Sequence, residues 1–268
     1  MKVAAIIPAR YHSTRLPGKP LADIAGEPMI RWVYERTQRA RLVDEVWVAT
    51  DDERILKLVE SFGGNSRMTS PEHQSGTDRL AEIAREMDWD LVVNVQGDEP
   101  LLDPAMVDAV VFCLQKNPSI YMSTLKREIT TVDEILNPNV VKVVTDTNEY
   151  ALYFSRSPLP YFHKIWKNTK SIDDGSLPLS IFKHIGLYAY RRDFLLHFAG
   201  LEPTPLEKIE HLEQLRVLEN GYKIKVIITK KDSIGVDSPD DLERVRRIVK
   251  TKGLSCNFLK EEDLIGQA

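Results

Sequence analysis

The sequence predicts an α/β fold, with a mostly parallel sheet, helices on both of its faces and a smaller mixed α+β lobe. Three observations lead to this prediction. The first third of the chain alternates short apolar runs with helical patterns, the middle contains a hairpin pattern and a long polar loop, and the last third returns to alternating helix and strand patterns. Alternation of this kind is typical of βαβ units and therefore of a parallel sheet.

The first third contains the strands that we expect at the centre of the sheet. They are continuous β-rich apolar runs, typical of strands buried on both faces: Val3–Pro8, Glu45–Thr50 and Leu91–Gln96. The segments between them carry apolar residues at helical spacing: Met29–Ala40, Asp52–Phe62 and Thr77–Met87. Ligands of such sheets bind at the carboxyl ends of the strands, near a change in strand order, so the loops directly after these strands are the expected place of a site.

The middle of the chain has a different pattern. Val140–Thr145 and Ala151–Ser155 are β-rich runs separated by a turn-rich pentad, which predicts an antiparallel hairpin. The stretch Arg156–Pro178 is polar and shows little periodicity, and loops of that length are usually functional or mobile. His184–Arg191 is then expected to be a further strand.

A helix is expected after Thr204. This residue is followed by Pro205 at the first helical position and by Glu207 three residues after the cap, which is the pattern of a capping box. We expect a buried stripe along one continuous helix: Ile209, Leu212, Leu215 and Leu218.

The end of the chain returns to the main domain. Lys223–Thr229 is expected to be a strand, and Ser238–Asp241 repeats the capping pattern before a helix from Pro239 to about Thr251, which we expect to pack on the main sheet. The chain is therefore divided into an α/β domain, a smaller lobe and a disordered tail, which are residues 1–120 with 200–252, residues 121–199, and residues 253–268.

Composition excludes several classes of function. The chain has 36 Lys and Arg against 40 Asp and Glu residues, a net charge of −4, and no long run of either sign, so neither nucleic acid nor a membrane surface is an expected partner. No apolar segment reaches the roughly 18 residues of a membrane span, and no signal-peptide pattern begins the chain, so we expect a cytoplasmic protein. Cys113 and Cys256 lie far apart without a C-x-x-C, which argues against a disulfide framework and a cysteine zinc site.

Several common enzyme motifs are absent. Neither G-x-G-x-x-G nor G-x-x-x-x-G-K-[ST] occurs, which argues against a standard dinucleotide fold and a P-loop NTPase. H-E-x-x-H and G-x-S-x-G are absent as well. What remains is an α/β enzyme that binds phosphate by other means.

The strongest chemical signal lies in Pro8–Pro20. This segment follows the first expected strand and gathers three cations, Arg10, Arg15 and Lys19, among small and turn-forming residues whose backbone N–H groups can approach an anion. A polyphosphate fits that chemistry. The alternative is a solvated basic loop, since Arg and Lys are usually exposed, but the position directly after a strand favours phosphate.

Together with other segments, this loop resembles the sugar nucleotidyltransferase family and, within it, the 3-deoxy-manno-octulosonate (Kdo) cytidylyltransferases. The resemblance covers residues 2–250 and rests on the basic loop, here Ile6–Leu21, and on His73–Arg79, Val93–Pro100, Tyr153–Pro158, Lys183–Tyr188, Glu210–Arg216 and Gly235–Pro239. It implies a Rossmann-like, nucleotide-diphospho-sugar transferase-like fold in which residues 1–120 and 200–252 bind the nucleotide. Residues 121–199 would then bind the sugar and build a homodimer.

The resemblance also implies the residues of a nucleotide site. Those that would bind CTP are Pro8, Ala9, Arg10, Lys19, Ser75, Gly76, Arg79 and Gln96. Ser75 and Gly76 would contact the cytosine base just before a helix, although an ordinary N-cap is the alternative.

A magnesium site and a catalytic group are implied as well. Asp98 ends one apolar strand and Asp237 ends another strand-like run, and the two carboxylates would hold Mg²⁺ against the triphosphate, since this ion prefers one or two carboxylates with waters and phosphates. Taken alone, Asp98 could be a turn aspartate before Pro100. The implied catalytic residues are Arg10, Arg15, Lys19, Asp98 and Asp237.

Kdo is an acid sugar, so its pocket needs a cation and several hydrogen-bonding groups. By resemblance these are Gln96, Arg156, His184, Tyr188, Glu210 and Gln214. Arg156 is the expected partner of the sugar carboxylate, and Glu210 and Gln214 would share one face of a helix. Without the resemblance, that face would be solvent-exposed surface and His184 a structural histidine.

The implied reaction is CTP + Kdo → CMP-Kdo + pyrophosphate, for lipopolysaccharide biosynthesis, with the anomeric hydroxyl of Kdo attacking the α-phosphorus in line. Positioning and charge neutralisation are expected to dominate, so no general base is named. The alternatives are the same chemistry on 8-amino-8-deoxy-Kdo or a sialic acid, and a catalytically silent nucleotide-binding regulator. The aromatic residues Tyr161, Phe162 and Trp166 are compatible with a dimer interface or with a mobile lid.

Overall fold

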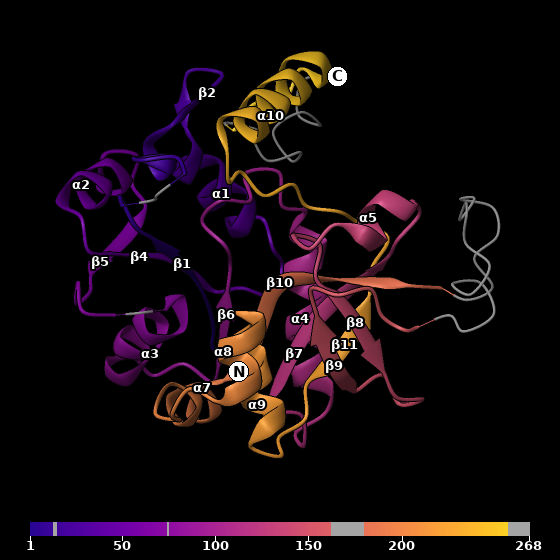
Figure 1. Ribbon diagram of the computed structural model, residues 1–268. Helices are drawn as coiled ribbons and strands as arrows, with labels where there is room; N and C mark the ends of the chain where they lie inside the picture. Colours follow the sequence, from indigo (N-terminus) through magenta and orange to yellow (C-terminus); the bar gives the residue numbers. More distant parts are fainter. Residues whose placement is uncertain (13–14, 74, 162–179, 257–268) are drawn as a thin grey trace, which may run out of the picture.

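The structure is a computed structural model that describes residues 1–12, 15–73, 75–161 and 180–256. Within these residues one nine-stranded sheet has the order β11-β7-β10-β6-β1-β4-β5, with β8 paired to β10 and β9 to β8 (Figure 1). Its strands are β1 (Val3–Ala9), β4 (Glu45–Thr50), β5 (Asn65–Met68), β6 (Leu91–Asn94), β7 (Met122–Glu128), β8 (Lys142–Thr145), β9 (Ala151–Ser155), β10 (Phe182–Arg191) and β11 (Lys225–Ile228). A separate two-stranded sheet consists of β2 (Asp23–Ile24) and β3 (Glu27–Pro28).

Helices cover both faces of the main sheet, and Figure 1 shows α2 and α3 on opposite sides of β4 and β5. The first face is covered by α1 (Met29–Gln38), α2 (Glu53–Ser61) and α4 (Pro104–Lys116), and the second by α3 (Gly76–Glu86), α7 (Arg192–Ala199) and α9 (Gln214–Glu219). Successive side chains of a strand point to opposite faces, so Ala5 and Ile7 of β1 join the first core and Ala4 and Ile6 join the second. The prediction of strands buried on both faces is confirmed.

Strand directions agree with the predicted class. β1 is parallel to β4 and β6, β4 is parallel to β5, and β7 is parallel to β11, whereas β10 is antiparallel to β6 and β7. The predicted hairpin is present as the antiparallel pair β8 and β9. Because β1 lies between β6 and β4, the strand order changes direction at β1, and the segments that follow β1 and β6 leave the sheet at the same edge.

Two predicted helix starts are confirmed. Thr204 and Glu207 form a capping box at the start of α8 (Pro205–Glu210). Ser238 and Asp241 form another at the start of α10 (Pro239–Lys252), so Ser238 rather than Asp237 is the N-cap. At α10 the Ser238 hydroxyl accepts from the first-turn N–H of Asp241 at 3.3 Å, and at α8 the Glu207 carboxylate accepts from the N–H of Thr204 at 3.1 Å.

The single helix predicted after Thr204 is wrong. His211 has φ of 53°, a left-handed conformation that ends α8, and α9 begins three residues later. The predicted buried stripe is wrong at Ile209, which is 75% exposed, while Leu212 and Leu215 are buried as expected.

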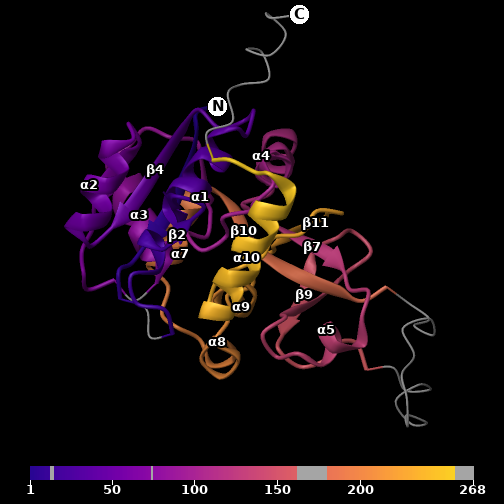
Figure 2. The same ribbon diagram turned by 90° about the horizontal axis from the view of Figure 1, so that it is seen from above.

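The helix α10 packs elsewhere than predicted. Its buried residues Val245 and Val249 join a cluster with Ile24 of β2 and Trp32 of α1, rather than packing on the main sheet. Figure 2 shows α10 lying across the outside of the molecule. Cys256 is buried in the same cluster, and residues 257–268 of the predicted disordered tail lie outside the described residues.

Residues 121–199, the predicted smaller lobe, contain α5 (Val132–Leu136) and the four strands β7 to β10. All four strands belong to the nine-stranded main sheet. The division into two domains therefore stays a prediction. No helix among the described residues has the length and apolar character needed to cross a membrane.

Candidate active site

Three of the predicted segments meet at the carboxyl end of β1. A Cβ atom on Gly97 would lie 2.7 Å from the carbonyl oxygen of Pro8, and one on Gly76 would lie 3.1 Å from Cγ of Pro8. Glycine at both positions lets the loop after β6 and the start of α3 come close to the end of β1. The basic loop, the start of α3 and the loop after β6 therefore surround one point.

Lys19 contacts both predicted carboxylates. Its Nζ lies 2.6 Å from Oδ2 of Asp98 and 3.1 Å from Oδ1 of Asp237, and Nη2 of Arg15 lies 3.2 Å from Oδ2 of Asp237. Burial lowers the pKa of Lys19, but the two carboxylates raise it by more, so the ammonium has a pKa above its ordinary value and stays charged. The structure thus brings together four of the five predicted catalytic residues.

A left-handed turn places Lys19. Gly18 has φ of 69°, its N–H donates to the carbonyl of Tyr11 at 2.9 Å, and the short helix η1 (Lys19–Leu21) begins directly after it. Glycine adopts this conformation without the steric cost that a Cβ atom brings. Ser13 and Thr14 of the basic loop, and Gln74 before α3, lie outside the described residues.

Arg10, the fifth predicted catalytic residue, follows β1. Burial and then the positive charge of Arg79 lower the pKa of Arg10, while Asp51 and Asp78 act in the opposite direction. Within the described part of the chain Arg10 forms no ion pair, so its guanidinium can bind an anion. Pro8 and Ala9, also predicted to bind nucleotide, end β1 immediately before it.

Ser75 is the N-cap of α3, which was the structural alternative for this residue. Its Oγ accepts from the N–H of Asp78 at 3.2 Å, and the Asp78 carboxylate accepts from the N–H of Ser75 at 3.0 Å. The Ser75 hydroxyl also hydrogen-bonds the Glu213 carboxylate, so its predicted contact with the cytosine base stays a prediction.

Arg79 is fully buried and has its partners within the protein, so its predicted contact with the nucleotide stays a prediction. Its Nη2 donates to the Asp51 carboxylate at 2.5 Å, and its Nη1 donates to Oγ1 of Thr69 at 2.7 Å. Asp51 follows β4 and Thr69 follows β5. Arg79 therefore joins α3 to the ends of two strands, and a buried guanidinium needs such partners.

Asp98 and Asp237 suit a magnesium ion. Both carboxylates lie within about 3 Å of one ammonium group, so a cation can lie within reach of both. Mg²⁺ takes oxygen ligands and is commonly held by one or two carboxylates, with water and phosphate as the others. Among the described residues no three His, Cys, Asp or Glu side chains form a metal-binding group, so water and substrate would complete the coordination.

On the predicted sugar side, His184 and Tyr188 lie together on β10. Their ring centroids are 5.3 Å apart, and Phe154 of β9 packs edge-on against His184 at 5.0 Å. Nε2 of His184 lies 3.0 Å from Oγ1 of Thr124, whose hydroxyl also contacts two carbonyls at the bulge of β10. Thr124 therefore fixes the orientation of the imidazole ring.

Burial controls the protonation of both rings. It lowers the pKa of His184 to about 3 and raises the pKa of Tyr188 above its ordinary value. At pH 7 the imidazole is neutral and the phenol keeps its proton. Both side chains can therefore recognise a ligand by hydrogen bonds, not by charge.

Arg156 and Glu210 bind each other. The Glu210 carboxylate accepts from the N–H of Arg156 at 3.0 Å and from Oγ of Ser155 at 2.5 Å, and Nε of Arg156 donates to the carbonyl of Glu210 at 2.8 Å. A guanidinium has five N–H donors, so some remain for a substrate carboxylate. The prediction that Glu210 and Gln214 share one helix is wrong, since the left-handed residue 211 ends α8, and Gln214 is buried in α9.

Gln96 connects the two sides of the site. Its Cγ lies 3.8 Å from the place that a Cβ of Gly186 would occupy on β10, and its Nε2 is 3.5 Å from Oδ1 of Asn94. Gln96 also precedes Asp98 by two residues. Gln96, which belongs to both predicted sets, therefore lies against the strand that carries His184 and Tyr188.

Two carboxyl groups near the site were missed in the sequence. Oγ1 of Thr77 donates to Glu213, which links the start of α3 to the segment between α8 and α9, and burial raises the pKa of Glu213. Burial, and then the charge of Asp98, raises the pKa of Glu99 to about 7. Both residues lie in segments that carry the resemblance, but no spacing signals that a carboxyl group will be buried.

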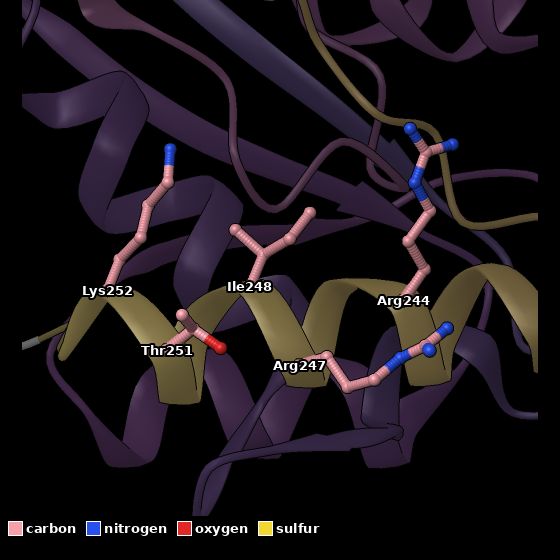
Figure 3. Close-up of a pocket in the computed structure, with 5 residues that line it drawn as sticks. All are labelled: Arg244, Arg247, Ile248, Thr251 and Lys252. Atoms are coloured by element: carbon pink, nitrogen blue, oxygen red, sulfur yellow. The ribbon is translucent and has the colours of Figure 1, made fainter.

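A separate hollow of about 450 Å³ lies on α10. Figure 3 shows the residues that line it, Arg244, Arg247, Ile248, Thr251 and Lys252. None of them is a predicted site residue. The converging side chains, not this hollow, therefore locate the candidate site.

A basic loop that faces paired carboxylates at the carboxyl edge of an α/β sheet suits the binding of a nucleotide's phosphates and transfer at phosphorus. The family model described as "Cytidylyltransferase" matches residues 4–225. The chain therefore belongs to the cytidylyltransferase family, and it is a nucleotidyltransferase.

Particular relatives carry the comparison further. The chain is 58% identical over 250 residues to the 3-deoxy-manno-octulosonate cytidylyltransferase of Geobacter sulfurreducens and 60% identical over 250 residues to that of Geotalea uraniireducens, in each case over 93% of this chain and 100% of the relative. A solved structure of CMP:2-keto-3-deoxy-manno-octonic acid synthetase complexed with CTP matches with a TM-score of 0.86 and 42% identity, over 94% of this chain and 100% of the other. The predicted family branch is confirmed.

A more distant structure shares the fold alone. It is a 4-diphosphocytidyl-2C-methyl-D-erythritol synthase from Anaerococcus prevotii, with a TM-score of 0.59 and 14% identity, over 93% of this chain and 98% of the other.

We expect His184 to make the protein less stable in acid. Its pKa is about 3 in the folded protein and 6.5 ordinarily, so below pH 6.5 the unfolded chain binds a proton that the folded protein does not. The free energy of unfolding then falls as the pH falls, by roughly 1 to 2 kcal/mol at pH 5 from this residue. In His184→Gln, urea denaturation at pH 7 and pH 5 should show a correspondingly smaller fall than in the wild type.

The matched control is the same substitution at His12, which is exposed. His12→Gln should keep the wild-type dependence on pH. An equally steep fall in His184→Gln and the wild type would show that the folded protein does protonate His184.

Proposed function

We propose that the chain transfers the CMP group of CTP to Kdo and releases pyrophosphate. The observation that carries this proposal is the contact of Lys19 with both Asp98 and Asp237, which places a basic loop and two carboxylates at the ends of β1 and β6. The relatives at 58% and 60% identity are named for this activity.

The charges of the site suit attack on a triphosphate. The anomeric oxygen of Kdo forms a bond to the α-phosphorus, the bond from that phosphorus to the bridging oxygen breaks, and pyrophosphate leaves. Arg10, Arg15 and Lys19 stabilise the triphosphate and then the leaving pyrophosphate. The hydroxyl proton passes to water as the new bond forms, and no side chain is assigned as its general base.

We propose Mg²⁺ as the cofactor, held by Asp98 and Asp237. When bound, the ion supplies positive charge against the α-phosphate and lowers the pKa of the attacking hydroxyl. Two observations support this assignment. The side chains of Asp98 and Asp237 offer negatively charged oxygen ligands, and both lie close to the ammonium group of Lys19.

The two substrates would bind on opposite sides of Gln96. Ser75 and Gly76, at the start of α3, would contact the cytosine base, and the neutral rings of His184 and Tyr188 would contact sugar hydroxyls. The remaining donors of the Arg156 guanidinium would bind the sugar carboxylate, with Glu210 and Gln214 beside it. CTP is a cytoplasmic nucleotide, so we propose that the protein acts in the cytoplasm.

Asp98→Asn is expected to lose about 100-fold or more in turnover, because the amide keeps the shape of the side chain but not its charge. Pyrophosphate release would be measured with CTP and Kdo at saturating Mg²⁺, with a thermal melt to show that the protein is folded. The control Asp240→Asn changes an exposed residue three positions after Asp237 and should keep wild-type turnover. Near-wild-type turnover of Asp98→Asn would contradict the metal assignment.

A substrate panel tests the reaction itself. Pyrophosphate release would be measured with CTP, UTP, ATP and dTTP against Kdo, 8-amino-8-deoxy-Kdo and sialic acid, and we expect release from CTP with Kdo alone. Release with the amino sugar alone would keep the nucleotide assignment and replace the sugar. No release from any pair would favour a catalytically silent nucleotide-binding regulator.

We also propose a homodimer. Leu152 on the outer strand β9 is 62% exposed and Tyr161 is 65% exposed, and apolar side chains on an outer strand favour association. Phe162 and Trp166 lie outside the described residues. Light scattering after size exclusion should give twice the 30.6 kDa of one chain, and a value near one chain mass would contradict the dimer.

A further inference from the structure

The segment that carries Asp237 is a long connection without regular structure. Residues 229–237, called the strap below, join β11 to α10 and contain no helix or strand, and Figure 1 shows this connection passing α5 on its way to α10. Beyond Thr229, whose N–H donates to the carbonyl of Lys126 on β7 at 2.9 Å, no ladder of sheet or helix hydrogen bonds holds this segment. The position of Asp237 therefore depends on the side-chain and backbone contacts of the strap.

The middle of the strap is held by a group of four charged side chains from four elements. Asp232 of the strap accepts from Nη1 of Arg127 on β7 at 2.9 Å and pairs with Nζ of Lys183 on β10 at 2.8 Å. Glu134 of α5 lies 3.2 Å from Nζ of Lys183 and 3.7 Å from Nη1 of Arg127. Each carboxylate thus faces both cations, and we call this group the charge quartet.

The quartet is better placed to hold a segment than an ordinary surface pair. The side chains of Lys183 and Arg127 are 14% and 22% exposed, so solvent screens their charges less than those of fully exposed residues. Removal of the Asp232 charge would leave Glu134 as the remaining ion-pair partner of both cations, with the buried Glu99 carboxyl near Lys183. The strap would then lose its contact with β7 and β10 at this point.

The end of the strap is bound to the other carboxylate segment. The N–H of Val236 donates to the carbonyl of Asp98 at 2.9 Å, and Val236 is fully buried. Nearer the middle of the strap, Nζ of Lys231 lies 2.9 Å from Oδ2 of Asp103, which follows the loop that carries Asp98. Between the quartet and this backbone hydrogen bond lie only three residues, 233–235.

We propose that Asp232 is a positioning residue that sets Asp237 opposite Asp98. The charge quartet holds the strap against β7 and β10, the Val236 hydrogen bond then forms, and the two carboxylates converge on one point. The inference rests on the proposed function, because the consequence of this placement is the affinity of the two carboxylates for Mg²⁺. Lys183 also precedes His184 on β10, so the strap is joined to the strand of the sugar side.

The test uses Asp232→Asn in the full chain and two measurements. In the protein without metal or substrate, hydrogen exchange at the amide of Val236 is expected to become about fivefold faster or more, because the strap opens more often. In the enzyme assay, the Mg²⁺ concentration for half-maximal pyrophosphate release is expected to rise roughly tenfold, with turnover at saturating Mg²⁺ within about twofold of the wild type.

Two further variants show whether the charge is responsible. Asp232→Glu keeps a carboxylate, so the exchange rate at Val236 and the Mg²⁺ requirement should both lie close to their wild-type values. Glu243→Gln removes the same charge from an exposed pair with Arg246 on α10 and should change neither measurement. If Asp232→Asn does not fold, Arg127→Gln takes its place, and we expect changes in the same direction from it.

The outcomes separate this inference from the proposed function. Unchanged exchange at Val236 overturns the inference whatever the activity does, and so does an unchanged Mg²⁺ requirement. A wild-type protein that releases no pyrophosphate at any Mg²⁺ concentration refutes the proposed function. The exchange measurement, made without metal or substrate, still decides whether Asp232 holds the strap.

Discussion

The rest of the site depends on the ion group formed by Lys19, Asp98 and Asp237. Two carboxylates that converge on one point repel each other, and each has lost part of its water, so a cation between them is a condition for the arrangement to form. Lys19 supplies it, and its raised pKa shows that the attraction exceeds the cost of burying the ammonium. The same attraction makes this place suitable for a metal cation, because the carboxylate oxygens of Asp98 and Asp237 are already directed at it.

Backbone packing delivers these charges. β1 is buried on both faces, so its carboxyl end is a fixed point, and the loop carrying Asp98 reaches it only because Gly97 leaves no Cβ to meet the Pro8 carbonyl. Lys19 is placed from the other direction by the left-handed turn at Gly18. The strap completes the site from the far end of the chain, through a main-chain hydrogen bond rather than through a strand.

Sequence signals that span only a few residues predicted the buried strands and the helix starts. Continuous apolar runs predicted the buried strands, and capping boxes predicted where α8 and α10 begin, because each signal lies within a few residues. The edge strand β5, with polar Asn65–Met68, gives no such signal, and nothing in the sequence marks His211 as left-handed. The parallel sheet predicted that the loops after its strands would form the site, but the convergence of Asp98 and Asp237 came from resemblance alone. Lys19 lies 79 positions from Asp98 and 218 positions from Asp237, and contacts over such separations leave no spacing pattern.

Charge is divided unequally across the site, and the substrates explain why. The nucleotide side combines the cations Arg15 and Lys19 with two carboxylates, whereas burial keeps the His184 ring neutral on the other side. An acid sugar and a triphosphate are both anions, so they approach each other only where positive charge offsets their repulsion. Arg10, Arg15 and Lys19 would supply that charge at the phosphates, with the proposed Mg²⁺ offsetting Asp98 and Asp237, and the neutral His184 ring would orient the sugar by hydrogen bonds. The burial of His184 against Phe154 therefore keeps that ring a neutral hydrogen-bonding group, and it leaves charge recognition of the sugar carboxylate to the Arg156 guanidinium proposed for it.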